Sequence, residues 1–292
     1  MRYRIEHLTR YQYSEAVTVC HNLAHLIPRS MDHQEVVQRT LHVTPTPAVL
    51  YESTDYFNNC LHYFEVLEPH QQLEVLASSE VVVLPRAPLS WPTTYCCWEQ
   101  VRDALCQSDD PDICYNRPFM FDSPLIRSSD CLAQFAANSF SAGRTLLDAV
   151  NDLMQRIYRE FTYCAAVTTV TTPLEEVMQH RQGVCQDFAH VAIGSLRAIG
   201  LAARYVSGYL ETSPPPGKSR LIGADASHAW FAVFVPGQGW IDFDPTNNLL
   251  PQERHITLAT GRDYSDVAPL KGVILGGGQE TLHVSVDVAP LP

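Results

Sequence analysis

Hydrophobic residues recur at helical spacing in two long stretches of the chain. Between residues 184 and 200 they stand three or four positions apart, which is the spacing of a helix with one buried face. Gly200 can end that helix in a left-handed conformation. A shorter helix is predicted at residues 129–138. Between residues 145 and 161 the spacing predicts a third helix, with a buried stripe at Leu146, Val150, Leu153, Ile157 and Phe161.

Short runs of β-branched and aromatic residues predict strands before and after these helices. In the first 85 residues, short strands at regular spacing favour an antiparallel sandwich or barrel; the runs are 3–8, 36–43, 61–66, 73–76 and 80–84. Further strands are predicted after the helices, at 201–210, 227–235, 240–244 and 282–288. The turn at 236–239 makes the second and third of these a hairpin.

The pattern divides the chain into three parts. A proline-rich connector at residues 85–92 ends an all-β, sandwich-like domain of residues 1–90. Residues 91–124 are predicted to be a linker, with a short helix near Trp98 and an extended loop at 108–124. Residues 125–292 are predicted to form an α+β core, in which the helix at 184–200 packs on an antiparallel sheet and a β segment follows.

Composition narrows the class of protein. With 46% hydrophobic and 18% charged residues the chain is that of a folded globular protein. A net charge of −12 argues against binding nucleic acid or an anionic membrane through a basic patch. No apolar run is long enough to cross a bilayer, and the first residues lack the apolar segment of a signal peptide. We therefore expect a cytoplasmic protein with no membrane or nucleic-acid partner; the oligomeric state is left open.

The cysteines point to a reducing compartment. There are nine of them, an odd number, and none is spaced as a Cys-x-x-Cys pair or with histidine as a zinc site. His21 and His25 would share a face only if that stretch were helical, which Asn22 and Pro28 disfavour. We therefore expect no metal site and no cofactor.

Three residues carry the candidate chemistry. Cys185 stands in the first turn of the predicted helix, where unsatisfied N–H groups and the helix dipole stabilise a thiolate; the alternative is a buried structural cysteine. His228 begins one hairpin strand and Asp244 ends the next. Because they are sixteen positions apart, an odd-length loop or a bulge is needed to bring them to one sheet face. A nucleophile, a base and an orienting carboxylate are then available, with Asp242 as the rival carboxylate.

Several motifs resemble the bacterial transglutaminase-like superfamily. They are Gly-Val-Cys-Gln-Asp-Phe-Ala-His at 183–190, Ala-Arg-Tyr-Val-Ser-Gly-Tyr-Leu at 203–210, His-Ala-Trp at 228–230 and Trp-Ile-Asp-Phe-Asp-Pro-Thr at 240–246. The resemblance implies a papain-like core with Cys185 as nucleophile, His228 as base and Asp244 as orienting acid. Asp244 is preferred because the family's acid lies in the Asp-Pro-Thr motif.

The resemblance extends to both ends of the chain. The segment from Tyr11 to Asn59 is similar to the β domain that precedes such cores, where the family usually has glycine in place of Asn58; asparagine also tolerates a left-handed turn. The C-terminal Gly-Arg-Asp-Tyr-x-Asp-Val-Ala-Pro resembles a signature of the bacterial subfamily. Arg262 and Asp263 within it are either cleft residues or a structural salt bridge.

The implied activity is acyl transfer from an amide or peptide substrate. Hydrolysis by a cysteine peptidase or amidase is preferred, because crosslinkers of the animal type resemble longer, calcium-regulated chains and no EF-hand loop is evident. Transamidation and a catalytically silent peptide-binding module are the alternatives. The backbone N–H of Cys185 is a candidate oxyanion donor. Further candidates for the oxyanion site or the cleft wall are Gln182, Gln186, Tyr209 and Trp230.

Overall fold

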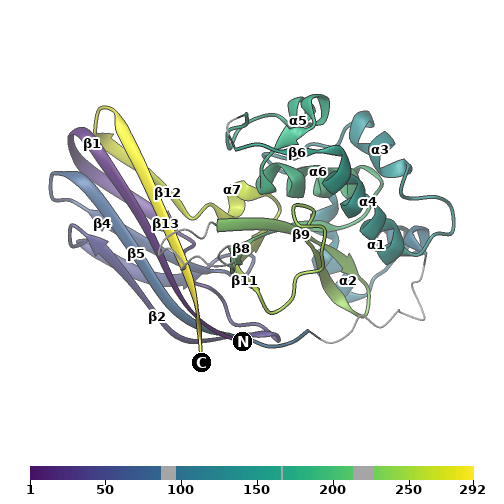
Figure 1. Ribbon diagram of the computed structural model, residues 1–292, viewed down its shortest axis with the longest axis horizontal. Helices are drawn as coiled ribbons and strands as arrows, with labels where there is room; N and C mark the ends of the chain where they lie inside the picture. Colours follow the sequence, from purple (N-terminus) through teal and green to yellow (C-terminus); the bar gives the residue numbers. More distant parts are fainter. Residues whose placement is uncertain (87–96, 166, 213–226) are drawn as a thin grey trace, which may run out of the picture.

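The computed structural model describes residues 1–86, 97–165, 167–212 and 227–292. Figure 1 shows a large β-sheet on one side and a helical region around a smaller sheet on the other. The two chain ends lie together, because Arg2 pairs with Leu291 in the large sheet. None of the helices in the described ranges is long and apolar enough to span a bilayer.

The N-terminal segment folds into antiparallel strands organised around a very long first strand. β1 (Arg2–Ala24) pairs through residues 2–12 with β5 (His70–Val83) and through residues 20–24 with β4 (Cys60–Val66). The outer strands are β2 (Gln34–Thr44) and β3 (Val49–Thr54), in the order β2-β5-β1-β4-β3. Phe64 and Val66 of β4 share a core with Leu73 and Val75 of β5. The strands form one antiparallel sheet with a hydrophobic core of its own. They are longer than the short strands that the sequence predicts.

The C-terminal strands complete this sheet. β12 (Leu270–Gly276) and β13 (Glu280–Leu291) both pair with β1, which places the last strands of the chain beside the first (Figure 1). This β segment was predicted to belong to the core of residues 125–292, and its pairing with β1 corrects that prediction. Alternating side chains identify a strand, but which edge it joins depends on contacts distant in sequence.

The predicted loop at 108–124 is wrong, because the chain there is helical. After α1 (Trp98–Gln107) come α2 (Pro111–Asn116) and the 3₁₀ helix η1 (Arg117–Met120). The Asp110 carboxylate accepts from the N–H of Asp112, with proline in the first turn of α2. This polar run is therefore a helix start, and Ile113 and Phe119 join the main core.

The core has a four-stranded antiparallel sheet in the order β10-β9-β8-β11. Its strands are β8 (Ala203–Leu210), β9 (Ser227–Val235), β10 (Gly239–Phe243) and β11 (His255–Gly261). Around it lie helices and two short strands: α3 (Asp130–Ala137), α4 (Leu146–Glu160), β6 (Thr162–Tyr163), α5 (Leu174–His180), β7 (Gln182–Gly183), α6 (Cys185–Ala198) and α7 (Tyr264–Val267).

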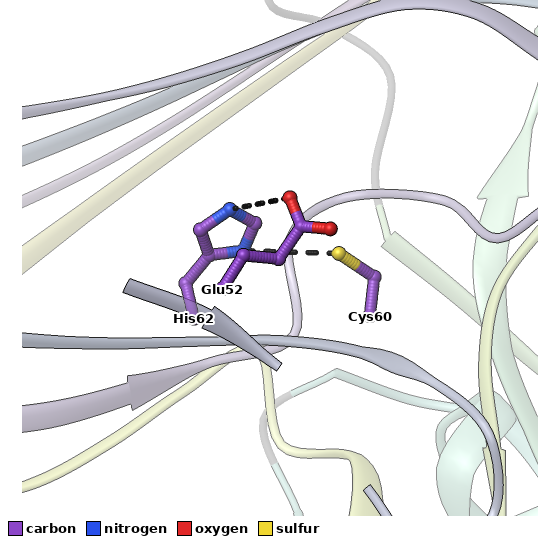
Figure 2. Close-up of side chains that lie close together, drawn as sticks. All are labelled: Glu52, Cys60 and His62. Carbon is purple, nitrogen blue, oxygen red and sulfur yellow. Dashed lines mark hydrogen bonds and ion pairs between the residues drawn. The ribbon is translucent and has the colours of Figure 1, made fainter. Parts of the chain in front are cut away.

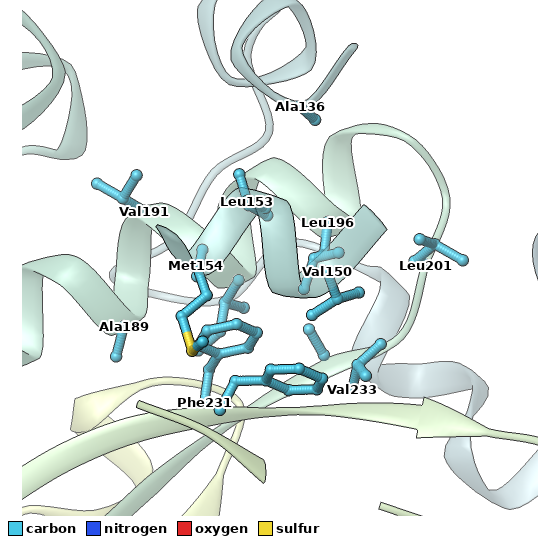
Figure 3. Close-up of a cluster of buried hydrophobic side chains, with 14 of the residues drawn as sticks. Ala136, Val150, Leu153, Met154, Ala189, Val191, Leu196, Leu201, Phe231 and Val233 are labelled. Atoms are coloured by element: carbon cyan, nitrogen blue, oxygen red, sulfur yellow. The ribbon is translucent and has the colours of Figure 1, made fainter. Parts of the chain in front are cut away.

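Hydrophobic packing holds α6 and α4 against the small sheet. Figure 3 shows Val150 and Met154 of α4 and Leu196 of α6 gathered over Phe231 and Val233 of β9. All five residues of the predicted stripe, four on α4 and then Phe161, are buried. Each such side chain stabilises the fold by about 1.5–3 kcal/mol. Gly200 has a φ of 84°, the left-handed conformation predicted for the end of α6.

Two side-chain amides join the N-terminal sheet to the core. Gln34 donates to the Thr257 carbonyl (2.7 Å) and accepts from the Thr257 N–H (2.8 Å), and Asn59 makes the same pair of bonds with Thr260. Each amide stands in for a peptide group of a neighbouring strand along β11. Asn58 holds the turn before Asn59 with a φ of 63°, in the left-handed region that the sequence predicts.

Candidate active site

Cys185 is the first residue of α6, and the chain before it is held by Asp187. The Asp187 carboxylate accepts from the N–H of Val184 (2.8 Å) and from the Thr168 hydroxyl (2.7 Å). A Cβ on residue 183 would lie 2.6 Å from Oδ2 of Asp187, so this position requires glycine. The Gly-Val-Cys-Gln-Asp sequence thus fixes the Cys185 backbone at the positive end of the α6 dipole.

The hairpin of β9 and β10 brings His228 and Asp244 to one face of the small sheet. Gly239 pairs with Val235, which leaves a loop of residues 236, 237 and 238, the odd-length loop that the sequence requires. Phe243 pairs with Phe231, so Asp244 follows beside Trp230, two positions along from His228. The His228 Nε2 and Asp244 Oδ2 atoms are 2.8 Å apart.

Asp244 is fully buried and accepts five hydrogen bonds from described groups. Oδ2 accepts hydrogen bonds from His228 Nε2, His255 Nε2 (3.0 Å) and Asn247 Nδ2 (2.8 Å). Oδ1 accepts hydrogen bonds from the backbone N–H groups of Thr246 (3.0 Å) and Asn247 (3.2 Å). Burial acts to raise the pKa of Asp244, but the hydrogen bonds from His228 and His255 outweigh it and hold that pKa well below its usual range. The group is therefore a carboxylate.

His228 carries a proton at neutral pH in this environment. Burial acts to lower its pKa, but the hydrogen bonds and charges of Asp244 and Cys185 outweigh that effect and raise the pKa of His228 to about 10. Cys185 is close enough to the imidazole to act on its pKa. The structure thus places the Cys185 thiol near an imidazolium that is hydrogen-bonded to a buried carboxylate.

The comparisons with known proteins show the family of this chain. Residues 3–82 match the bacterial transglutaminase-like N-terminal region, and residues 133–245 match the transglutaminase-like superfamily. An uncharacterized protein of Mycobacterium tuberculosis is 42% identical over 99% of this chain and 93% of its own length. The chain belongs to the transglutaminase-like superfamily.

Two other relatives extend the comparison. The crystal structure of a proposed cysteine protease from Cytophaga hutchinsonii superimposes with a TM-score of 0.77, covering 100% of this chain and 92% of that one at 22% identity, which shows the shared fold. A protein-glutamine gamma-glutamyltransferase of Pseudomonas aeruginosa is 36% identical over 95 residues, covering 31% of this chain and 14% of that protein.

Asp242, the rival carboxylate of this transglutaminase-like protein, has other partners. Its Oδ2 lies 2.8 Å from Arg86 NH1. Burial acts to raise the pKa of Asp242, but Arg86 and Arg204 together lower it. Arg204 also stacks on Trp240, 4.4 Å from the ring centre. Asp242 therefore belongs to a salt-bridge network between the core and the end of the N-terminal sheet.

Tyr209 and Trp230 are packed residues rather than open cleft walls. Tyr209 is fully buried, and its hydroxyl lies 2.9 Å from His7 Nδ1 at the contact with the N-terminal sheet. Trp230 is also fully buried, but its ring lies against His228 (5.9 Å between centres). A Cβ on residue 208 would lie 2.4 Å from that indole, so Gly208 makes room for it.

The remaining predicted site residues lie at other places. Gln186 donates to the Val170 carbonyl (3.2 Å), and Gln182 is exposed in β7. Arg262 forms a salt bridge with Asp266 (2.9 Å). Of the two alternatives for Arg262, a cleft residue or a structural salt bridge, this contact favours the second. Asp263 accepts from Leu125 N–H (2.8 Å) and caps α7.

Among the residues that the structure describes, two clusters hold ligand types that metals use. Glu52, Cys60 and His62 lie together on β3 and β4 (Figure 2). His62 lies between its partners, with Nε2 3.4 Å from Glu52 Oε2 and Nδ1 3.9 Å from Cys60 Sγ. One ion could use only one ring nitrogen, and Arg39 already binds both Glu52 and Cys60. The cluster is better described as a hydrogen-bonded network.

The second cluster is His228, Asp244 and His255. Its shared carboxylate oxygen already accepts three hydrogen bonds, so its lone pairs are committed. No motif in the sequence points to His255. It opens a β-branched run after a long loop, and no local pattern connects it with Asp244.

Proposed function

We propose that this chain is a thiol acyltransferase that hydrolyses amide or peptide bonds through Cys185, His228 and Asp244. The observation that carries the proposal is the 2.8 Å bond between His228 and the buried Asp244 carboxylate, with the Cys185 thiol at the N-terminus of α6 close enough to raise the pKa of His228. A thiolate paired with an imidazolium is the reactive form of such a nucleophile. We also propose a reducing, cytoplasmic location, which the free thiols of the eight described cysteines support.

In the first half-reaction the Cys185 thiolate attacks the carbonyl carbon of the substrate. A carbon–sulfur bond forms, and the carbonyl oxygen becomes an oxyanion. The first N–H groups of a helix lack intrahelical partners, so the N–H of Cys185 can stabilise that oxygen. Donors of this kind typically contribute about 10²–10³-fold in rate. When the carbon–nitrogen bond breaks, His228 gives its proton to the departing amine and a thioester stays on the enzyme.

In the second half-reaction water resolves the thioester. Neutral His228 takes a proton from water, and the resulting hydroxide adds to the carbonyl carbon. The carbon–sulfur bond breaks, the carboxylic acid leaves, and the proton on His228 again faces a thiolate. Asp244 stays ionised throughout and stabilises the imidazolium in one orientation, as its five hydrogen bonds allow.

Transamidation is the second candidate reaction. It differs only in the acceptor, since a primary amine replaces water in resolving the thioester. The relative named as a protein-glutamine gamma-glutamyltransferase favours it, because its 95 matched residues are 36% identical to this chain. Hydrolysis is preferred because it needs no binding site for a second substrate.

The test is to trap the acyl-enzyme. The protein is incubated with a peptide mixture, quenched in acid and digested, and mass spectrometry locates any acyl group on the Cys185 peptide. A parallel incubation contains a primary amine such as methylamine: accumulation of acid alone supports hydrolysis, and a new amide supports transamidation. An adduct absent from Cys185, with activity retained in Cys185→Ala, contradicts both candidates. A wild-type protein that binds peptides without converting them would instead support the silent binding module.

A further inference from the structure

His255 shares a carboxylate oxygen with His228. It is the first residue of β11 and only 3% exposed. Its Nε2 lies 3.0 Å from Asp244 Oδ2, the same atom that His228 Nε2 contacts at 2.8 Å. The two imidazoles therefore approach one oxygen, and they come from different strands of the small sheet.

The two imidazoles have opposite tendencies to carry a proton. The pKa of His228 is raised, whereas burial and the charge of His228 lower the pKa of His255 although Asp244 acts to raise it. Neutral imidazole has one N–H. Since the Asp244 carboxylate can only accept, that N–H belongs on Nε2 of His255. Its Nδ1 is buried and has no hydrogen-bond partner among the described residues, as expected of an unprotonated nitrogen.

Trp230 holds the two rings in place. The His255 ring stands edge-on to the indole, 5.3 Å between centres at an interplanar angle of 87°. The His228 ring lies against the same indole, 5.9 Å away. The His255 backbone N–H donates to the Gln252 carbonyl at 3.0 Å. The ring thus has packing and main-chain constraints that direct Nε2 to Asp244.

We infer that His255 is a positioning residue, whose Nε2–H holds Asp244 Oδ2 in the orientation that accepts from His228. This inference rests on the proposed function of the Cys185, His228 and Asp244 set. Without that donor a buried carboxylate oxygen loses one of three partners and can rotate away from His228. His228 then loses the orientation in which it pairs with the Cys185 sulfur, so the effect reaches the nucleophile indirectly.

The inference is tested with iodoacetamide, which alkylates Cys185 without a known substrate. His255→Leu removes the donor, and His255→Gln keeps an N–H donor near the position of Nε2. We expect His255→Leu to slow alkylation of Cys185 at pH 7 by about 10- to 100-fold, as lost support of an active group commonly does. We expect its rate to rise with pH as for a model thiol, and His255→Gln to keep the wild-type profile within about threefold. His7→Leu, which removes another buried histidine, should leave the profile unchanged.

Two results would overturn the inference. One is a wild-type alkylation profile in His255→Leu; the other is equal slowing in the leucine and glutamine variants, which would indicate packing alone. If His255→Leu does not fold, a measurement on the wild-type chain still tests the inference. Nitrogen NMR of ¹⁵N-histidine-labelled protein should find His255 neutral with its proton on Nε2, and a proton on Nδ1 would contradict us. Failure of the proposed function is separate, because it appears as full activity in Cys185→Ala.

Discussion

The described residues include two sets of cysteine, histidine and carboxylate. In the N-terminal sheet Cys60 faces His62, and His62 faces Glu52 (Figure 2). In the core Cys185 lies near His228, and His228 is hydrogen-bonded to Asp244. The two sets are similar as residue types, but the pKa of the histidine is lowered in the sheet and raised in the core.

Burial decides the charges in the sheet, and polar contacts decide them in the core. Cys60 lies on a strand, and burial together with Glu52 raises the pKa of its thiol to about 11. Burial also lowers the pKa of His62, although Glu52 acts against this. Glu52 is 42% exposed, so water screens its charge. Asp244 is fully buried, and with Cys185 it raises the pKa of His228 to about 10. A histidine between a thiol and a carboxylate is thus insufficient without a buried, hydrogen-bonded acid.

The largest expected difference is in catalysis. Cys185→Ala should lower the rate of amide hydrolysis by about 10⁴-fold or more, as loss of a nucleophile does in other triads. Cys60→Ala should retain wild-type kcat, because its thiol is protonated at neutral pH. Both are measured with a substrate identified by acyl-enzyme trapping. A comparable loss in Cys60→Ala would mean that the sheet cluster takes part in the reaction.

The second largest difference is expected between the carboxylates of the two sets, Asp244 and Glu52. Asp244→Asn should lower kcat by about 10²–10⁴-fold, because His228 loses the charge and the acceptor that keep it protonated and oriented. Glu52→Gln is the matched change in the sheet, and its kcat should stay within about twofold. Steady-state kinetics of the two variants decide the point. An Asp244→Asn enzyme with wild-type kcat would remove Asp244 from the proposed mechanism.

Alkylation compares the two cysteines within one protein sample. At pH 7 iodoacetamide should modify Cys185 about 10²-fold faster than Cys60, since a thiolate is the reactive species. Cys60 should become reactive only as the pH rises toward about 11, the pKa of its buried thiol. Peptide mass spectrometry after timed quenching measures both rates at once. Equal rates at pH 7 would erase the distinction between the clusters.

Acid should weaken the core through Asp244. Its pKa is lower in the folded state than in the unfolded chain, so its contribution to stability is present above about pH 4 and is lost as the pH falls below that value. Urea unfolding should find Asp244→Asn less stable than the wild type by about 2–3 kcal/mol at pH 7. That difference should shrink below pH 3. Exposed Glu52→Gln should change stability by less than about 0.5 kcal/mol.

Local patterns were enough to predict the elements that present the candidate site. Hydrophobic spacing placed Cys185 at the start of α6 and defined the buried stripe of α4. The proline-glycine turn predicted the hairpin, and the requirement that His228 and Asp244 share a sheet face predicted an odd-length loop or a bulge; the structure has the odd-length loop. These features depend on residues within about one or two turns or strands of each other, where periodicity and turn chemistry act directly.

Non-local contacts were beyond the sequence pattern. Nothing near Gln34 or Asn59 indicates that their amides would bind Thr257 and Thr260. The helix at Pro111 was misinterpreted because its cap, Asp110, also suits a loop. Tyr209 matched the strand pattern but faces His7 rather than a cleft.

The sequence by itself determined where helices and strands begin, which faces are apolar, and which three residues could form a thiol site. Only the tertiary structure decided that the last strands complete the first sheet. It also decided that Arg86 forms a salt bridge with Asp242, whereas Asp244 accepts hydrogen bonds from His228 and His255. The reason is physical: periodicity and capping arise between near neighbours, whereas strand partners and the charges of buried groups depend on residues that meet only after the chain has folded.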